Sequence, residues 1–288
     1  MSDKTGIFYH PSFSRRSYLT VGNRLSDFPE ALDPLLSSPR IEMFQSSPIS
    51  MDLLLKIHSP SMIEAVKSDG SCGTAFHSAG GVVEASERVA KGELLNAFSF
   101  IGAGGHHAGK NYFWGACCFN DVVLSIVRLR ELGVANRFAI LDTDAHHGDG
   151  TRELVMNDPD VLHLCCCDRD WESSDGLKQD FDVTLTYQGG KVEEEYMSII
   201  TDVAIPKIER FNPDLFFWYF GFDTCSGDYG SLGLSREFFV EMGRKLVDMA
   251  YKNWGGKMHV VLAGGANRET ATWLIPRIIQ LLAQEEIL

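Results

Sequence analysis

The stretch FAILDTDAHHGDG, residues 138–150, indicates both the fold of the chain and the place of its chemistry. Phe138 to Leu141 form a short apolar run, as expected of a strand that is buried in a parallel sheet. Three acids and two adjacent histidines then fall within eight residues. A lone Asp-x-Asp is typical of a solvated turn, but a histidine pair directly after a buried strand is not. Since open α/β sheets bind ligands at the carboxyl ends of their parallel strands, we expect a functional site here.

Apolar runs and helical patterns alternate along the rest of the chain. The predicted strands cover residues 5–10, 97–101, 138–141, 161–167, 181–185, 215–222 and 257–262. The predicted helices cover residues 78–94, 121–132, 151–156, 193–211, 236–254 and 269–282, with an N-cap at Ser235, a kink at Pro206 and an interruption at Pro276. Residues 11–50, rich in Ser, Pro and Arg, are expected to be irregular with short helical pieces.

This alternation predicts an α/β fold, namely a single domain with a predominantly parallel β-sheet and helices on both faces. No linker or shift in composition divides residues 1–288, and 44% of them are hydrophobic, so one large core can be buried. We expect the site to be built by loops at the carboxyl ends of four strands.

The charge and the hydropathy exclude several classes of partner. The net charge is −13 and no run of Lys or Arg is present, so direct nucleic-acid binding is not expected, whereas a cationic substrate would be attracted. No window approaches the 18 or so apolar residues of a membrane span, and the start lacks a signal-peptide core. A soluble, cytoplasmic protein is expected. The oligomeric state is not indicated.

The seven cysteines do not form a Cys-x-x-Cys pair anywhere in the chain. Neither a disulfide framework nor a structural zinc site is therefore expected. The run from Cys165 to Cys167 is interpreted as core packing rather than as metal ligands.

Three side chains that follow two different strands suit a divalent metal ion. Asp144 and His146 have an i, i+2 spacing that can aim both at one point, and Asp223 ends the apolar run 215–222. Three protein ligands leave positions for water and substrate, as in catalytic zinc sites. Such an ion polarises a carbonyl and lowers the pKa of a bound water to about 7.

A glycine loop after the strand 97–101 carries the pair His106 and His107. Imidazoles are the commonest general acids and bases, so these two residues are candidates for proton transfer. Asp142 and Asp149 would then orient the two rings, as carboxylates commonly orient histidines at metal sites.

These residues resemble those of one family, the zinc-dependent histone deacetylases and acetylpolyamine amidohydrolases, which share their fold with arginase. The resemblance is carried by GHHAG at 105–109, GACCFND at 115–121, DTDAHHGDG at 142–150 and GFDTCSGD at 221–228, with weaker matches at 56–66 and 78–85. It implies an arginase/deacetylase-like fold and hydrolysis of an N-acyl amide by metal-activated water, which releases a carboxylic acid and an amine.

The resemblance also implies a role for each matching residue. Asp144, His146 and Asp223 correspond to the zinc ligands, although these ligand types suit Fe(II) or Co(II) as well. His107 corresponds to the general base and acid and is paired with Asp149. His106 is paired with Asp142 and assists electrostatically.

Arginase-like ureohydrolases are the nearest competing interpretation. Their binuclear manganese site requires two further Asp residues, and those positions are Gly148 and Cys225 in this chain. A mononuclear site is therefore expected, which disfavours ureohydrolase activity.

The chain departs from the family after its late glycine loop. Deacetylases usually carry a Tyr there that donates a hydrogen bond to the developing oxyanion, whereas Asn267 occupies the position here. Loss of one such donor typically costs about 100-fold to 1000-fold in turnover. Asn267 could donate through its shorter amide, or a tyrosine from elsewhere could replace the donor, with Tyr18, Tyr112 and Tyr229 as candidates. Otherwise the substrate differs from acetyl-lysine, or catalysis is weak.

The walls of the substrate channel also depart from the family, because Ala116 stands where Phe is common. Candidate substrate-binding residues, each equally well explained as packing, are Trp114, Gly115, Ala116, Trp171 and Gly265, with Phe113 as a further possible aromatic wall. Arg15 and Arg16 could correspond to the early Arg that lies near the acetate-release path in the family, but the simpler interpretation is that both are surface arginines.

Two functions remain open from the sequence. The first is a zinc-dependent hydrolase that acts on acyl-lysine or on a small acylated amine or polyamine. The second is a weakly active or inactive member of the fold that binds an acyl group or a metal, since the usual oxyanion donor is missing. The intact histidines His106 and His107 favour the enzyme, because a pure binding protein does not need them.

Overall fold

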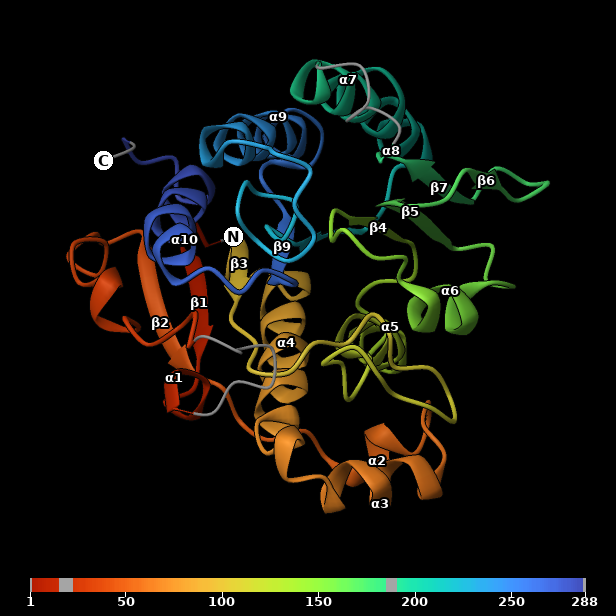
Figure 1. Ribbon diagram of the computed structural model, residues 1–288. Coiled ribbons are helices and arrows are strands. Elements are labelled where there is room, and N and C mark those ends of the chain that lie inside the picture. The colour runs from red at the N-terminus through yellow and green to blue at the C-terminus, as the bar shows by residue number, and fades with distance from the viewer. Residues whose placement is uncertain (1, 16–22, 185–190, 287–288) are drawn as a thin grey trace.

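The computed structural model describes residues 2–15, 23–184 and 191–286. Within this part of the chain, nine strands form one sheet in the order β2-β1-β3-β9-β8-β4-β5-β7-β6 (Figure 1). The strands are β1 (Thr5–Tyr9), β2 (Ile41–Gln45), β3 (Asn96–Ser99), β4 (Phe138–Asp142), β5 (Val161–Cys167), β6 (Trp171–Glu172), β7 (Lys178–Asp182), β8 (Leu215–Phe220) and β9 (Met258–Leu262). All neighbouring pairs are parallel except β6 and β7, which are antiparallel.

Helices cover both faces of this sheet, as predicted. The helices of the described residues are α1 (Ser12–Arg15), α2 (Met51–Leu54), α3 (Pro60–Ser68), α4 (Ala75–Ala90), α5 (Asp121–Glu131), α6 (Asp149–Val155), α7 (Val192–Ser198), α8 (Ile205–Phe211), α9 (Arg236–Trp254) and α10 (Arg268–Leu282). Ser86 of α4 bonds to His259 of β9, on the face that also carries Phe217. Gly243 of α9 packs against Trp218, whose side chain points to the opposite face because strand side chains alternate.

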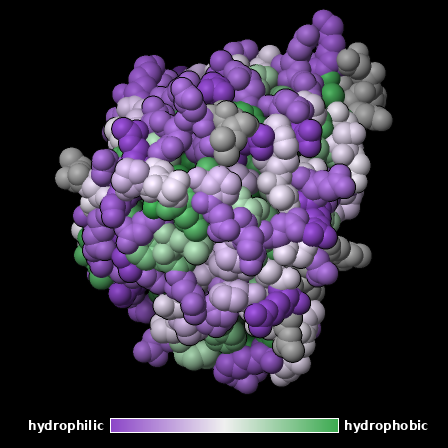
Figure 2. Space-filling view, turned by 90° about the vertical axis from the view of Figure 1, so that its left-hand side faces the viewer, coloured by the Kyte–Doolittle hydropathy of each residue, from purple (hydrophilic) through white to green (hydrophobic). Residues whose placement is uncertain are grey.

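The central strands form because their residues are apolar on both faces. Every residue of β4, β5, β8 and β9 is buried, which is the pattern of parallel strands that helices cover on each side. The surface is largely hydrophilic over the face in Figure 2, where hydrophobic side chains gather only in small patches. None of the helices in the described part of the chain has the length and apolar content needed to cross a bilayer.

Two strands of the structure, β2 and β7, differ from the prediction. Strand β2 falls in residues 11–50, where irregular chain was predicted, because this edge strand is only partly buried and its sequence IEMFQ lacks an apolar run. Strand β7 starts at Lys178 rather than at residue 181, and Leu185 lies outside the described residues. Lys178 is buried although it is charged, because its ammonium group donates to the carbonyls of Asp158 and Val161. A pattern of apolar residues therefore does not predict the start of this strand.

Pro276 acts differently from the prediction, whereas the helix at residues 193–211 changes its regular winding just before Pro206. Helix α10 continues through Pro276 instead of being interrupted there. The buried side chains on both sides of it, such as Leu274 and Ile278, supply packing that outweighs one missing N–H bond. In the 193–211 helix, a π-helical segment (Ile199–Ala204) precedes Pro206, which lies in the first turn of α8, where proline is tolerated.

Candidate active site

The polar residues of the sequence motifs meet at the carboxyl ends of four neighbouring strands, β3, β9, β8 and β4. They line a cavity of about 630 Å³. The walls include both histidines of the glycine loop, two of the expected metal ligands and two residues of the late loops: His106, His107, Asp144, His146, Tyr229 and Asn267. Because parallel strands end at the same edge of a sheet, four loops far apart in sequence can share one cavity.

Asp144, His146 and Asp223 form a compact cluster at this cavity, and one ligand atom from each lies within 4.8 Å of the others. Nδ1 of His146 lies 3.0 Å from Oδ1 of Asp144 and 3.2 Å from Oδ2 of Asp223. Oδ2 of Asp144 accepts a hydrogen bond from the Gly264 N–H, and Oδ1 of Asp223 accepts one from the Ala145 N–H. Backbone donors from two loops therefore hold both carboxylates in place.

The cluster concentrates negative charge in a buried place. Oδ2 of Asp223 is buried and accepts no well-formed hydrogen bond within the described residues. Burial and the neighbouring Asp144 raise the pKa of Asp223 to about 7, and the close approach of the His146 Nδ1 to the carboxylates of Asp144 and Asp223 raises the pKa of His146 to about 10. These directions show that the cluster attracts positive charge, and its donor set of two carboxylates and one imidazole fits a divalent cation such as zinc.

His106 is held by Asp142 inside the protein. Its Nδ1 lies 2.9 Å from Oδ2 of Asp142, and its Nε2 lies 3.8 Å from Oδ1 of Asp144. Burial lowers the pKa of His106, but the charges of Asp142 and Asp144 outweigh it and raise this pKa to about 9. Its ring stacks on Tyr219 at 5.2 Å, so His106 is a fixed and readily protonated group beside the cluster.

His107 has a different environment from its neighbour. Its Nδ1 lies 2.6 Å from Oδ1 of Asp149, whose Oδ2 accepts a hydrogen bond from the Trp114 indole at 3.0 Å. The ring of Trp114 packs on His107 at 3.9 Å. Burial lowers the pKa of His107, although the bond to Asp149 opposes that effect. A neutral His107 can therefore accept a proton at Nε2, the ring nitrogen that Asp149 does not hold.

Asn267 has a structural task in addition to its place at the cavity. It is the N-cap of α10, and its Oδ1 accepts a hydrogen bond from the Thr270 N–H at 2.9 Å. The carboxylate of Asp228 accepts hydrogen bonds from the Ala266 and Asn267 N–H groups and so fixes the loop before the helix. The capping bond occupies the side-chain oxygen of Asn267, whereas its amide N–H₂ is the group that could donate to an oxyanion.

Tyr229 brings a phenol hydroxyl to the cavity that Asn267 also lines. Its hydroxyl accepts a hydrogen bond from the Gly265 N–H at 3.0 Å, and its ring stacks on His146 at 5.7 Å. A Cβ placed on Gly264 would lie 2.7 Å from this hydroxyl, 2.2 Å from Oδ2 of Asp144 and 2.9 Å from Oδ2 of Asp223. The hydroxyl therefore lies beside both carboxylates of the cluster.

The expected channel residues are only partly brought together. Trp114 is half exposed at the cavity, and Gly115 and Ala116 line it with left-handed backbone at φ of 57° and 63°. A side chain at Gly115 would lie 2.6 Å from Cδ2 of His107, which explains the glycine there. Trp171 lies elsewhere, in a second cavity with Arg152 and Asp180, because β6 is an edge strand that β5 and β7 separate from the strands of the site.

Gly265 supports the site from behind rather than forming its wall. Its N–H donates to Tyr229, and its carbonyl accepts from the fully buried Arg24 at 2.8 Å. Arg24 also donates to the Ala263 carbonyl, and nothing in its own sequence neighbourhood singled it out. Arg15 is exposed at the end of α1, whereas Arg16 and Tyr18 lie outside the described residues.

The sheet order and the cluster at its carboxyl edge define the class of this protein. The chain has an arginase/deacetylase-like α/β fold, and a solved structure, the HD domain of HDA15, superimposes with a TM-score of 0.81. That likeness covers 98% of this chain and 89% of the solved one at 20% sequence identity.

The profile of the histone deacetylase domain matches residues 19–282, so the chain belongs to the histone deacetylase family of hydrolases. It is 28% identical to a probable deacetylase of Archaeoglobus fulgidus, with 93% of this chain and 82% of the archaeal protein covered. It is 30% identical to human histone deacetylase 7 over 68% of this chain but only 22% of the human protein.

Proposed function

We propose that this protein hydrolyses N-acyl amides, with acyl-lysine or a small acylated amine or polyamine as substrate, at a mononuclear zinc site. The observation that carries the proposal is the cluster of Asp144, His146 and Asp223 at one cavity with two Asp-held histidines. A divalent ion held there would polarise the amide carbonyl and activate a water molecule. Fe(II) or Co(II) would suit the same ligands.

The two histidines divide the proton chemistry between them. Since His107 is neutral and is oriented through Nδ1 by Asp149, its Nε2 takes the proton from the attacking water and later gives it to the leaving amine. His106, whose pKa the carboxylates raise, holds its proton and stabilises negative charge as it develops on the substrate. Both roles follow from the different partners of two adjacent residues.

The hydroxyl of Tyr229 takes the part of the missing oxyanion donor in this proposal. Because its oxygen accepts from the Gly265 N–H, its hydrogen is available to a substrate oxygen in the cavity. The position beside Asp144 and Asp223 places this donor next to the ligand cluster. Tyr229 precedes Asn267 by a whole strand and a helix, so the donor reaches the same site from a different loop.

The substrate is expected to be cationic, because the chain carries a net charge of −13. The half-exposed Trp114 at the cavity gives an alkyl or acyl chain an apolar surface. All seven cysteines are free and buried, which agrees with a reducing compartment, and we propose the cytoplasm. Neither nucleic acid nor membrane has a part in this proposal.

The experiment is turnover of the zinc-loaded protein on fluorogenic acyl-lysine amides and acylated polyamines, with His107→Ala as the matched inactive variant. Turnover that His107→Ala abolishes supports the proposal. The second function, an acyl-binding protein with little turnover, follows from the absence of the usual oxyanion Tyr at the position of Asn267. It would be indicated if wild type and His107→Ala bind an acyl-lysine equally and neither hydrolyses it.

A further inference from the structure

A second group of metal-ligating side chains lies outside the proposed catalytic cluster. Cys165 and Cys167 point to the same face of β5, since side chains two residues apart in a strand do so. Asp180 of the neighbouring strand β7 pairs with Cys165 in register, and His147 reaches the group from the loop after β4. One ligand atom from each of the four side chains lies within 4.8 Å of the others.

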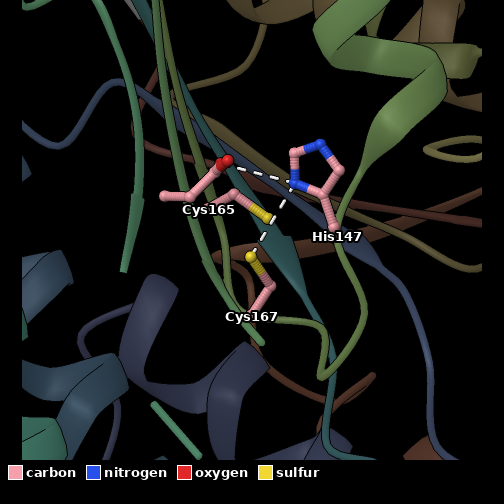
Figure 3. A group of neighbouring side chains, drawn as sticks. His147, Cys165 and Cys167 are labelled. Atoms are coloured by element: carbon pink, nitrogen blue, oxygen red, sulfur yellow. Dashed lines mark hydrogen bonds and ion pairs between the residues drawn. The ribbon is translucent and has the colours of Figure 1, made fainter. Parts of the chain in front are cut away.

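The chain turns its two adjacent histidines to different clusters. His146 directs Nδ1 to Asp144 and Asp223, whereas Nδ1 of His147 lies 3.4 Å from Oδ1 of Asp180 and 3.7 Å from Sγ of Cys167. Figure 3 shows the ring of His147 facing the sulfurs of Cys165 and Cys167. Both sulfurs are fully buried, and the imidazole is only 9% exposed.

We infer that His147, Cys165, Cys167 and Asp180 form a second metal site, which holds a structural zinc ion. Two thiolates, an imidazole and a carboxylate make a closed set of four ligands, as structural zinc requires. The ligand atoms of a tetrahedral zinc site lie roughly 3.5 Å apart, and the two distances to His147 lie on either side of that value. The sequence alone favours core packing for these cysteines, because the proximity of Asp180 and His147 depends on the tertiary structure.

The charges of the surrounding groups balance such an ion. Asp180 accepts a hydrogen bond from the buried guanidinium of Arg152 at 2.6 Å. Two thiolates and the Asp180 carboxylate carry three negative charges, which a divalent ion and Arg152 neutralise together. Binding therefore exchanges two thiol protons for one zinc ion, and the protons leave to solvent. A cavity of about 530 Å³ lined by His147, Arg152 and Asp180 gives the ion a path to the cluster.

The effect of the second site would be to tie down the loop that carries the catalytic residues. That loop connects β4 to α6, contains Asp144 and His146, and leads directly into Asp149 at the start of α6. The Gly148 N–H already contacts Sγ of Cys165 at 3.5 Å, and this thiol lies 3.9 Å from the His146 carbonyl. A zinc ion would join the loop to β5 and β7 and would reduce its freedom to move. The inference does not depend on the reaction at the other cluster.

The test is zinc content and cobalt absorption of the full chain. We expect two zinc ions per chain in wild type and one in the Cys165→Ser/Cys167→Ser variant. Cobalt-loaded wild type should show the near-ultraviolet charge-transfer band of a thiolate ligand, and the double variant should lose it. Cys166→Ser, whose thiol lies on the other face of β5 near Tyr196, is the matched control and should keep both.

A variant of the catalytic cluster keeps the test decisive if the double variant fails to fold. Asp223→Asn should bind one zinc ion fewer than wild type and should still show the thiolate band with cobalt. One zinc ion per chain in wild type without a thiolate band would overturn the inference.

Discussion

Replacing Tyr229 by Phe removes one hydroxyl and leaves the ring that stacks on His146. In the substrate-free protein the variant lacks the hydroxyl that accepts a hydrogen bond from the Gly265 N–H at 3.0 Å. We therefore expect the free energy of unfolding to fall by only about 1 kcal/mol. In the transition state it removes the proposed oxyanion donor. Such a loss costs about 2.7 to 4 kcal/mol, which corresponds to a decrease in kcat of about 100-fold to 1000-fold. KM should change little, because the hydroxyl interacts mainly with charge that develops during the reaction.

The assay compares acetyl-lysine with trifluoroacetyl-lysine amides. The fluorines withdraw electrons and stabilise the oxyanion themselves, so the trifluoroacetyl substrate should lose less turnover than the acetyl one. Tyr112→Phe is the control, because Tyr112 is another partly exposed tyrosine, near Glu153, that has no part in the proposed chemistry. A kcat of Tyr229→Phe within about threefold of wild type on acetyl-lysine would refute the role of this hydroxyl.

Other substitutions probe the ligands, the cap and a buried histidine. Asp223→Asn should lower the affinity of the catalytic zinc by at least about 100-fold, measured by competition with a chelator; unchanged affinity would exclude Asp223 as a ligand. Asn267→Ala removes the N-cap of α10 and should lower the free energy of unfolding in urea by about 1 kcal/mol, whereas Asn267→Ser should retain most of it. Burial lowers the pKa of His259 from its ordinary value of 6.5 to about 3. Between these two pH values the imidazole of the unfolded chain is protonated, whereas that of the folded chain is neutral. The free energy of unfolding therefore decreases as the pH falls below 6.5, and the contribution of His259 to this decrease is about 2 kcal/mol at about pH 5. His259→Gln should weaken that dependence, and an identical pH profile in the variant would contradict it.

Much of the sheet could be predicted from the sequence. The four strands that carry the site were predicted within two residues at each end, because each is a short run buried on both faces. Strand β2 was missed because an edge strand is half exposed and lacks such a run. Strand β7 was misplaced because its charged Lys178 finds carbonyl partners inside the protein. A single domain over residues 1–288 stays a prediction.

Part of the candidate site was predictable from residues that are close in sequence, and the family resemblance supplied distant members such as Asp223. The spacing of Asp144 and His146 within one loop is local, so their proximity follows from the chain itself. Asn267 was interpreted only against the family pattern, and its capping bond to Thr270 emerged from the structure. Trp171 was predicted to line the substrate channel but lies in another cavity. The sequence places this aromatic residue after a strand, but it does not say which neighbouring elements the side chain contacts.

The sequence by itself determined the central strands of the sheet, the loops that carry polar chemistry and the side chains available to a metal ion, since each of these depends on residues a few positions apart. Only the tertiary structure brought together distant groups that neither the local spacing nor the family resemblance had joined. It placed the Tyr229 hydroxyl beside Asp144, and it joined His147 to two cysteines of the next strand. Such contacts depend on strand order and on the packing of the loops, and no local pattern of residues encodes them.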